Sequence, residues 1–254
     1  MKRSLPLAAA VTLSAAALAI PAGPALAAGH GHHHSTQHAT KAHTHAGKAQ
    51  AKLDHQRQGI AHAVAAQVRQ IDGLLSLTNT TDQVSDTDRT ALLAALQADH
   101  DAVTVVQASL ADATTRRQLV GDLRQAVLVR SIARQQFAVA ASVATVRQDV
   151  STSTASAQDL QTQVDAATTA GQDTTAANAA LSDAGQQLAT ATAEADDAVA
   201  QVLAVAPGAT RDQLNAAVDA AEADLTAAGT ALMTGGQDLL TVQQDIAAWG
   251  TVTP

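Results

Sequence analysis

The amino-acid sequence predicts an all-α protein, an elongated antiparallel helical bundle or coiled coil. Across residues 210–249, apolar side chains follow one another at alternating steps of four and three. That 3.5-residue period keeps one stripe of a helix against partner helices. Between Gly121 and Gly171 the chain contains no Gly or Pro, which favours a second long helix. Aromatic residues make up 1% of the 254 residues, so the core consists of Ala, Val and Leu and favours thin, closely approaching helices.

Start and stop signals divide the chain into five predicted helices. Ser85 with Asp88 resembles a capping box, as does Thr210 with Gln213, and each opens a helix. Gly171 supplies the left-handed residue that ends a helix, and the following Asp at 173 is expected to cap the next one. The predicted spans are 49–77, 85–110, 115–170, 173–205 and 210–249.

The third predicted helix determines the architecture. Val129, Val143 and Val150 belong to a four-three seam that continues in phase to Ala167. A Ser/Thr cluster at residues 151–154 has the composition of a loop, but a loop would usually reset the phase of the seam. We therefore expect one continuous helix over residues 115–170. Short connections make neighbouring helices antiparallel, which predicts two three-helix bundles in tandem, at residues 48–135 and 136–250, sharing this helix.

The second helix carries a polar residue on its apolar face. Asp99 and His100 are adjacent, and one of them must enter the seam whichever way the helix turns. We expect the inward residue to pair with an arginine of the third helix, such as Arg124 or Arg130, and to fix the helix register. A functional pocket is the rarer alternative.

The amino terminus has the features of a secretory signal peptide over residues 1–27. A basic start is followed by an apolar run from Leu5 to Ile20, two prolines, and Ala-Leu-Ala at the expected cleavage site. The alternative is a retained membrane anchor, but the run is too short for a confident span. We therefore expect the mature protein to be secreted, extracellular or associated with the cell wall, with no membrane span.

Residues 28–47 form a His-rich tail with almost no apolar content, for which we expect disorder. Its seven histidines are His30, His32, His33, His34, His38, His43 and His45. Neutral imidazole binds Zn, Ni or Cu, and close spacing raises affinity because the second ligand is nearly intramolecular. One hypothesis is that this tail binds metal outside the cell; the other is that it is a soluble, pH-sensitive linker.

Charge is unevenly distributed along the chain. Residues 116–147 contain six arginines and one acidic residue, whereas residues 151–254 contain thirteen acidic residues and one arginine. The overall charge of −8 argues against a nucleic-acid partner. Arg117 and Arg124 share one face, while Arg130 and Arg134 form a second pair elsewhere. We expect these arginines to pair with the acidic fourth and fifth helices; docking onto an anionic cell-wall polymer is the alternative.

Four short segments resemble a group of uncharacterised secreted, Ala-rich helical proteins of high-GC Gram-positive bacteria. They are Leu-Leu-Ala-Ala-Leu-Gln-Ala-Asp at 92–99, Gly-Asp-Leu-Arg at 121–124, Ala-Gly-Gln-Asp at 170–173 and Val-Ala-Pro-Gly at 205–208. The resemblance covers about residues 49–249 and implies export and a helical fold, without catalytic residues. Relatives of this kind often carry more aromatic residues near the middle of the third helix, where this chain has only Phe137.

No catalytic motif is present in the sequence. There is no cysteine, no nucleophile triad, no phosphate-binding glycine loop and no zinc-hydrolase motif. A thin bundle also offers little concave apolar space for a substrate. The sequence therefore predicts a non-enzymatic structural or interaction module at the cell envelope, with no required cofactor and with a wall polymer or a second copy as partner. Metal binding through the His-rich tail is the alternative function.

Overall fold

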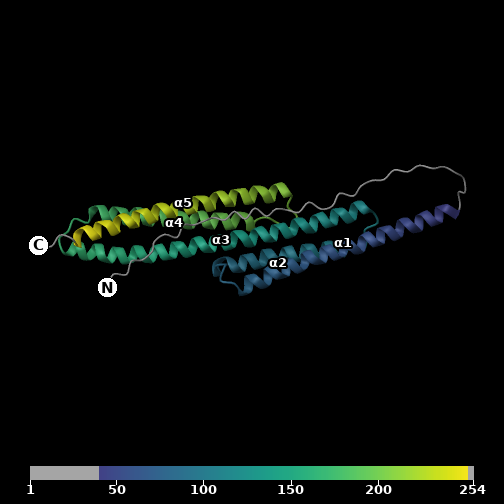
Figure 1. Ribbon diagram of the computed structural model, residues 1–254, viewed down its shortest axis with the longest axis horizontal. Helices are drawn as coiled ribbons and strands as arrows, with labels where there is room; N and C mark the ends of the chain where they lie inside the picture. Colours follow the sequence, from purple (N-terminus) through teal and green to yellow (C-terminus); the bar gives the residue numbers. More distant parts are fainter. Residues whose placement is uncertain (1–39, 251–254) are drawn as a thin grey trace. The chain divides into compact units, whose positions relative to one another are not determined.

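The computed structural model describes residues 40–250, whose regular structure is entirely helical (Figure 1). Its helices are α1 (Thr40–Thr80), α2 (Asp86–Ser109), α3 (Arg116–Thr169), α4 (Thr175–Leu203) and α5 (Arg211–Gly250). The all-α prediction is confirmed. No helix in this range is both long enough and apolar enough to cross a membrane. Backbone contacts divide the chain into residues 1–49 and 50–254, and the packing described below belongs to the second unit.

Helix α1 begins at Thr40, nine residues before the predicted start at 49. The helix therefore covers residues 40–47, for which the sequence predicts disorder. Extending an existing helix adds one hydrogen bond per residue without a new nucleus, and the Ala and Lys residues of this segment are good helix formers. The predicted signal peptide and the rest of the His-rich tail, residues 1–39, lie outside the described residues.

Helix α3 is one uninterrupted helix, as the continuous seam predicts. It begins at a capping box, in which the Gln118 N–H donates to Thr115 Oγ1 and the Thr115 N–H donates to Gln118 Oε1. Beyond the Ser/Thr cluster, Leu160 and Val164 are buried, so the seam keeps its phase. Gly171 follows the helix with φ +83°, in the left-handed conformation predicted for it.

Two predicted helix starts have different outcomes. At α5, Gln213 N–H donates to Thr210 Oγ1 and Thr210 N–H donates to Gln213 Oε1, which confirms the capping box. At α4, the N-cap is Thr174 instead of Asp173. The Asp173 carboxylate accepts a hydrogen bond from the Thr175 N–H. An Asp side chain often bonds the backbone two residues further on, in an Asx-turn, and here it does so just before the helix.

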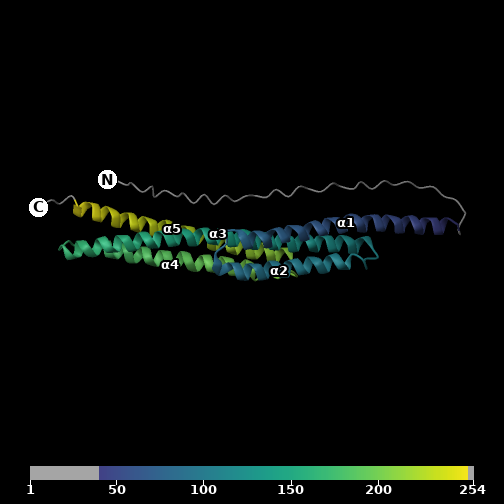
Figure 2. The ribbon, with the colours of Figure 1, turned by 90° about the horizontal axis from the view of Figure 1, so that it is seen from below.

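Helix α3 contacts α2, α4 and α5 along its length, and Figures 1 and 2 show α2 and α4 running beside it. Its Arg130 donates to Gln70 of α1. One hydrophobic cluster contains residues of all five helices. Because α3 has neighbours on more than one side, it buries two lines of residues in this region, namely Ala126, Ala133 and Ala140, and Val129, Gln136 and Val143.

Polar side chains of one helix hold the ends of the others. Arg89 of α2 donates to the carbonyl oxygens that follow α1, including that of Thr81 at 3.0 Å. Gln136 of α3 is 1% exposed, and its Nε2 donates to the carbonyls of Val202 and Val205 at the end of α4. These bonds satisfy helix-end carbonyls that have no partner within their own helix.

Helices α4 and α5 pack through small residues. The buried positions of the pair include Ala184, Ala191, Ala195 and Ala198 on α4 and Ala221, Ala228, Ala231 and Gly235 on α5. A Cβ atom placed on Gly235 would lie 3.2 Å from Gln187 Cβ and 3.4 Å from the Ala184 carbonyl oxygen. The backbones of the two helices therefore approach closely at Gly235, whereas Gly236 faces open space.

Candidate interaction surface

One of the six arginines of α3 forms ion pairs with acidic side chains. Arg147 contacts the carboxylate of Asp88 on α2, donates to Ser85 Oγ at 2.6 Å, and donates to Asp196 Oδ1 on α4 at 2.5 Å. Burial lowers the pKa of Arg147, but the hydrogen bonds and charges of Asp196 and Asp88 outweigh it and raise the pKa above its usual value. The predicted pairing with the acidic helices is therefore confirmed at this one position.

The other five arginines of α3 have no acidic partner within residues 40–250. We call them the arginine face: Arg116, Arg117, Arg124, Arg130 and Arg134. Arg117 and Arg124 are seven residues apart, so they share one heptad position. Arg116 and Arg130 are fourteen residues apart and share a second one. Arg134 occupies the position between the two. All five therefore lie on one side of α3, and the expectation that Arg130 and Arg134 lie on a separate face from Arg117 and Arg124 is wrong. Four of them are exposed and Arg130 is half-buried.

The predicted pairing of these five arginines with α4 and α5 is wrong, and the acidic residues explain why. Asp183, Asp197, Asp212 and Asp219 are exposed on their own helices. Because an Asp side chain is short, it reaches a neighbouring helix only from a position at the interface. Asp196 is the acidic residue of α4 whose carboxylate reaches an arginine of α3.

Charge is concentrated around Arg130. Its Nη1 donates to Gln70 Oε1 at 2.9 Å, and its Nε is buried without a partner. Burial lowers the pKa of Arg130, and the nearby charge of Arg134 lowers it further. Two positive charges close together, without an acidic partner among the described residues, favour the approach of an anion.

A pocket of about 500 Å³ lies near the middle of this arginine face, beside Arg124. Leu123, Val127 and Leu128 of α3 form its apolar lining, and Arg124 and Arg211 form its charged lining. Arg211 is the first residue of α5. The sequence does not predict its place beside Arg124, because residue spacing within one helix does not show where the end of another helix lies.

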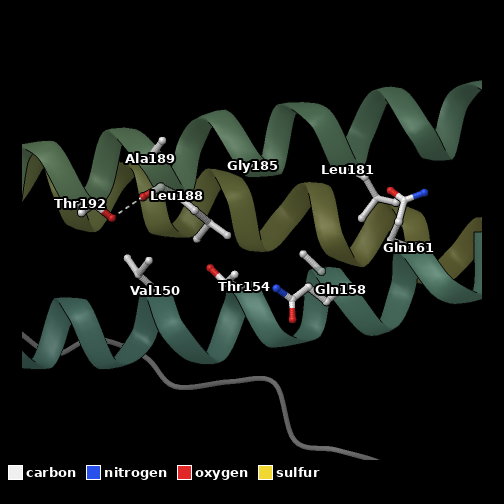
Figure 3. A pocket seen from close by; sticks show the side chains of 10 residues that line it. Val150, Thr154, Gln158, Gln161, Leu181, Gly185, Leu188, Ala189 and Thr192 are labelled. Atoms are coloured by element: carbon white, nitrogen blue, oxygen red, sulfur yellow. Dashed lines mark hydrogen bonds between the residues drawn. The ribbon is translucent and has the colours of Figure 1, made fainter.

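A second pocket, of about 450 Å³, lies between α3 and α4 (Figure 3). Val150, Leu181 and Leu188 supply apolar side chains, and Thr154 and Gln158 supply polar ones. Every residue that lines this pocket is uncharged. Its lining therefore contains no ionisable side chain that could act as a general acid or base.

Asp99, not His100, enters the seam of α2. Asp99 is 0% exposed, and both of its carboxylate oxygens are buried without a hydrogen-bond partner. Burial raises the pKa of the Asp99 carboxyl to about 7. The predicted pairing with Arg124 or Arg130 is wrong, because Arg130 donates to Gln70 and Arg124 lies at the pocket beside Arg211.

His100 lies at the edge of the contact between α1 and α2. Its Nε2 is 3.3 Å from Asp72 Oδ1 on α1, and its Nδ1 is 3.3 Å from Asp101 Oδ1. The side chain is 26% exposed. His100 therefore links the two helices, whereas no group of three or more metal-binding side chains occurs in the part of the chain that is described.

The metal-ligand prediction concerns the tail before this bundle. His30, His32, His33, His34 and His38 lie outside the described residues, and His43 and His45 fall in the first turns of α1. The metal hypothesis stays a prediction.

No protein-family model matches this chain, and comparison with curated proteins and with solved structures finds no similar protein.

Proposed function

We propose that the chain is a secreted, non-enzymatic helical module that binds an anionic polymer at the cell envelope through its arginine face. The observation that carries this proposal is that five arginines on one side of α3 have no acidic partner among residues 40–250. The acidic residues of the same protein, which outnumber the basic ones 23 to 15, leave this side of α3 uncompensated.

The chemistry of the face favours phosphate or carboxylate groups. Arginine presents a planar fork of donors that matches these groups bidentately, and the face contains no lysine. From Arg116 to Arg134 the face extends over eighteen residues, or about 27 Å of helix. A linear polymer can bridge that length, whereas a single small anion contacts one end of it.

The architecture supports presentation of such a face. We interpret the fold as two three-helix bundles in tandem, residues 48–135 and 136–250, which share α3 as the common helix. The arginine face lies on the part of α3 that packs with α1 and α2, where the first residues of α5 also reach it, and the acidic helices α4 and α5 supply most of the second bundle. Like charges on a polymer and on α4 and α5 repel, which orients the bound protein.

The test is sedimentation of mature protein, residues 28–254, with purified cell walls. The variant R116Q/R117Q/R134Q removes three exposed charges from the face, and K48Q/K52Q/R69Q removes three exposed charges from α1 as a matched control. We expect the face variant to lose about tenfold in wall affinity, the control to stay near wild type, and binding to weaken as salt rises from about 50 to about 300 mM. Equal binding by the two variants, or binding insensitive to salt, would exclude the proposal.

Metal binding by the His-rich tail is the alternative function. Deleting residues 28–47 separates the two, because it removes all seven histidines and leaves the arginine face in place. Wall binding that survives this deletion supports the arginine face, and wall binding that depends on the tail and on added Zn or Ni supports the alternative.

A further inference from the structure

The pocket at Arg124 and Arg211 differs from the rest of the arginine face in having an apolar wall. Leu123 and Val127 lie one turn apart on α3, and Leu128 is adjacent. Its volume of about 500 Å³ is within the range of small-molecule sites in proteins. Arg116, Arg117 and Arg134 are exposed and Arg130 donates to Gln70, whereas at this pocket arginines lie beside half-buried apolar side chains.

The two arginines of the pocket have no counter-charge. Neither Arg124 nor Arg211 forms an ion pair or a hydrogen bond to an acidic side chain. Asp122 lies two residues before Arg124, about 200° around the helix, and so projects to the other side of α3. Asp212 follows Arg211 and is exposed. No acidic residue lines the pocket, so its two positive charges are not compensated from within its lining.

An ion alone does not use the whole site. Inorganic phosphate would neutralise the guanidinium groups but would leave the wall formed by Leu123, Val127 and Leu128 in contact with water. A neutral apolar molecule would cover that wall and leave the two charges uncompensated. A ligand that carries both an anionic group and an aliphatic body satisfies both parts, since burial of apolar area contributes roughly 25 cal/mol per Å².

We infer that this pocket binds a single-chain amphiphilic anion, an aliphatic chain that ends in a phosphate or carboxylate. Arg124 and Arg211 bind the anionic group, and the aliphatic chain packs on Leu123, Val127 and Leu128. This goes beyond the proposed function, which requires charge alone and rests on the whole arginine face, of which Arg124 is the member that lines the pocket.

Isothermal titration of the mature protein tests the inference with three probes. Dodecyl phosphate below its micelle concentration carries both features, inorganic phosphate carries the anion alone, and dodecyl maltoside carries the chain alone. We expect saturable binding of dodecyl phosphate with an affinity at least about tenfold above that of either other probe. Equal affinities for dodecyl phosphate and inorganic phosphate, or for dodecyl phosphate and dodecyl maltoside, would overturn the inference.

Variants separate this site from the polymer surface. R124Q/R211Q and, independently, V127D should each weaken dodecyl phosphate binding by about tenfold or more, with helical content by circular dichroism as the check on folding. R116Q/R117Q/R134Q should bind dodecyl phosphate as wild type does while losing wall affinity. Wild-type binding of dodecyl phosphate by both R124Q/R211Q and V127D would refute the pocket and leave the polymer proposal standing. Binding to phosphatidylglycerol vesicles tests a membrane surface as the alternative ligand. A higher affinity for these vesicles than for dodecyl phosphate would also refute the inference.

Discussion

Asp88 and Asp99 are both buried on α2, yet their surroundings differ. The carboxylate of Asp88 accepts hydrogen bonds from Arg147 and Ser85, so its charge is compensated. Asp99 has no partner, and the Oε1 atom of Gln67 on α1 is also buried without one. A buried carboxylate without a donor is costly. Burial raises the pKa of Asp99 to about 7. The Asp99 carboxyl therefore stays protonated to a higher pH than an exposed Asp would.

Stability should consequently depend on pH through Asp99. The folded chain binds the Asp99 proton more tightly than the unfolded chain does. The contribution of Asp99 to the free energy of unfolding is therefore greatest below about pH 4, falls as the pH rises toward 7, and is constant above it. The loss is on the order of 4 kcal/mol for a shift from 3.8 to about 7. Asp99→Asn should match wild type near pH 4 and exceed it in urea unfolding at pH 8.

The control for that measurement is Asp101→Asn, which alters an exposed carboxylate two residues away. Hydrogen bonds from Gln97 and His100 lower the pKa of Asp101. The contribution of Asp101 to the free energy of unfolding therefore increases with pH, whereas that of Asp99 decreases. If Asp99→Asn and wild type have the same unfolding free energy at both pH values, Asp99 is not held protonated in the fold.

At the level of the helix, seams were predictable and contacts between helices were not. The seam of α2 places Leu92, Asp99 and Val106 on one buried line, as the four-three spacing predicts. The continuity of α3 also follows from spacing, because phase is a property of a single helix. The partner of an inward side chain depends on the rotation and offset of a second helix. For this reason the pairing expected for Asp99 and the pocket at Arg211 could not be obtained from sequence.

The neighbouring glycines of α5 offer an element-scale prediction. Gly236 faces open space, so Gly236→Ala should stabilise the fold by about 1 kcal/mol through helix propensity. Gly235 lies against Gln187 and Ala184 of α4, so Gly235→Ala should gain less, and Gly235→Leu should destabilise by about 2 kcal/mol or more. Thermal unfolding followed by circular dichroism measures both.

Gly236→Leu is the matched control for Gly235→Leu, because it adds the same side chain one position away. A close α4–α5 contact predicts a large difference in Tm between the two Leu variants. If both melt together, the two helices are not closely packed at Gly235.

Across the whole molecule, packing is denser where helices from both ends of the sequence meet. From residue 126 to 143, eight residues of α3 are buried. From residue 144 to 169, Leu160 and Val164 are the buried residues of α3, and the pocket of Figure 3 lies beside them. Fewer buried contacts imply a lower free energy of local opening at that end.

Trp249, the single tryptophan, reports on this less densely packed end. It packs against the cluster that contains Leu160, Val164 and Leu239. In urea, we expect tryptophan fluorescence to change at a lower concentration than the circular dichroism signal, which reports on all the helices. Coincident transitions would show that the two regions unfold as one cooperative unit.

The alanine-based seam between α4 and α5 has a chemical consequence as well as a geometric one. Among the described residues, the buried hydrophobic positions are occupied by Ala, Val, Leu and Ile. Methionine and cysteine are the side chains whose sulfur oxidants attack most readily, and Met233 is 69% exposed. A sulfoxide formed there would project into water, so peroxide would find no sulfur to modify in the interior of the bundle formed by residues 40–250.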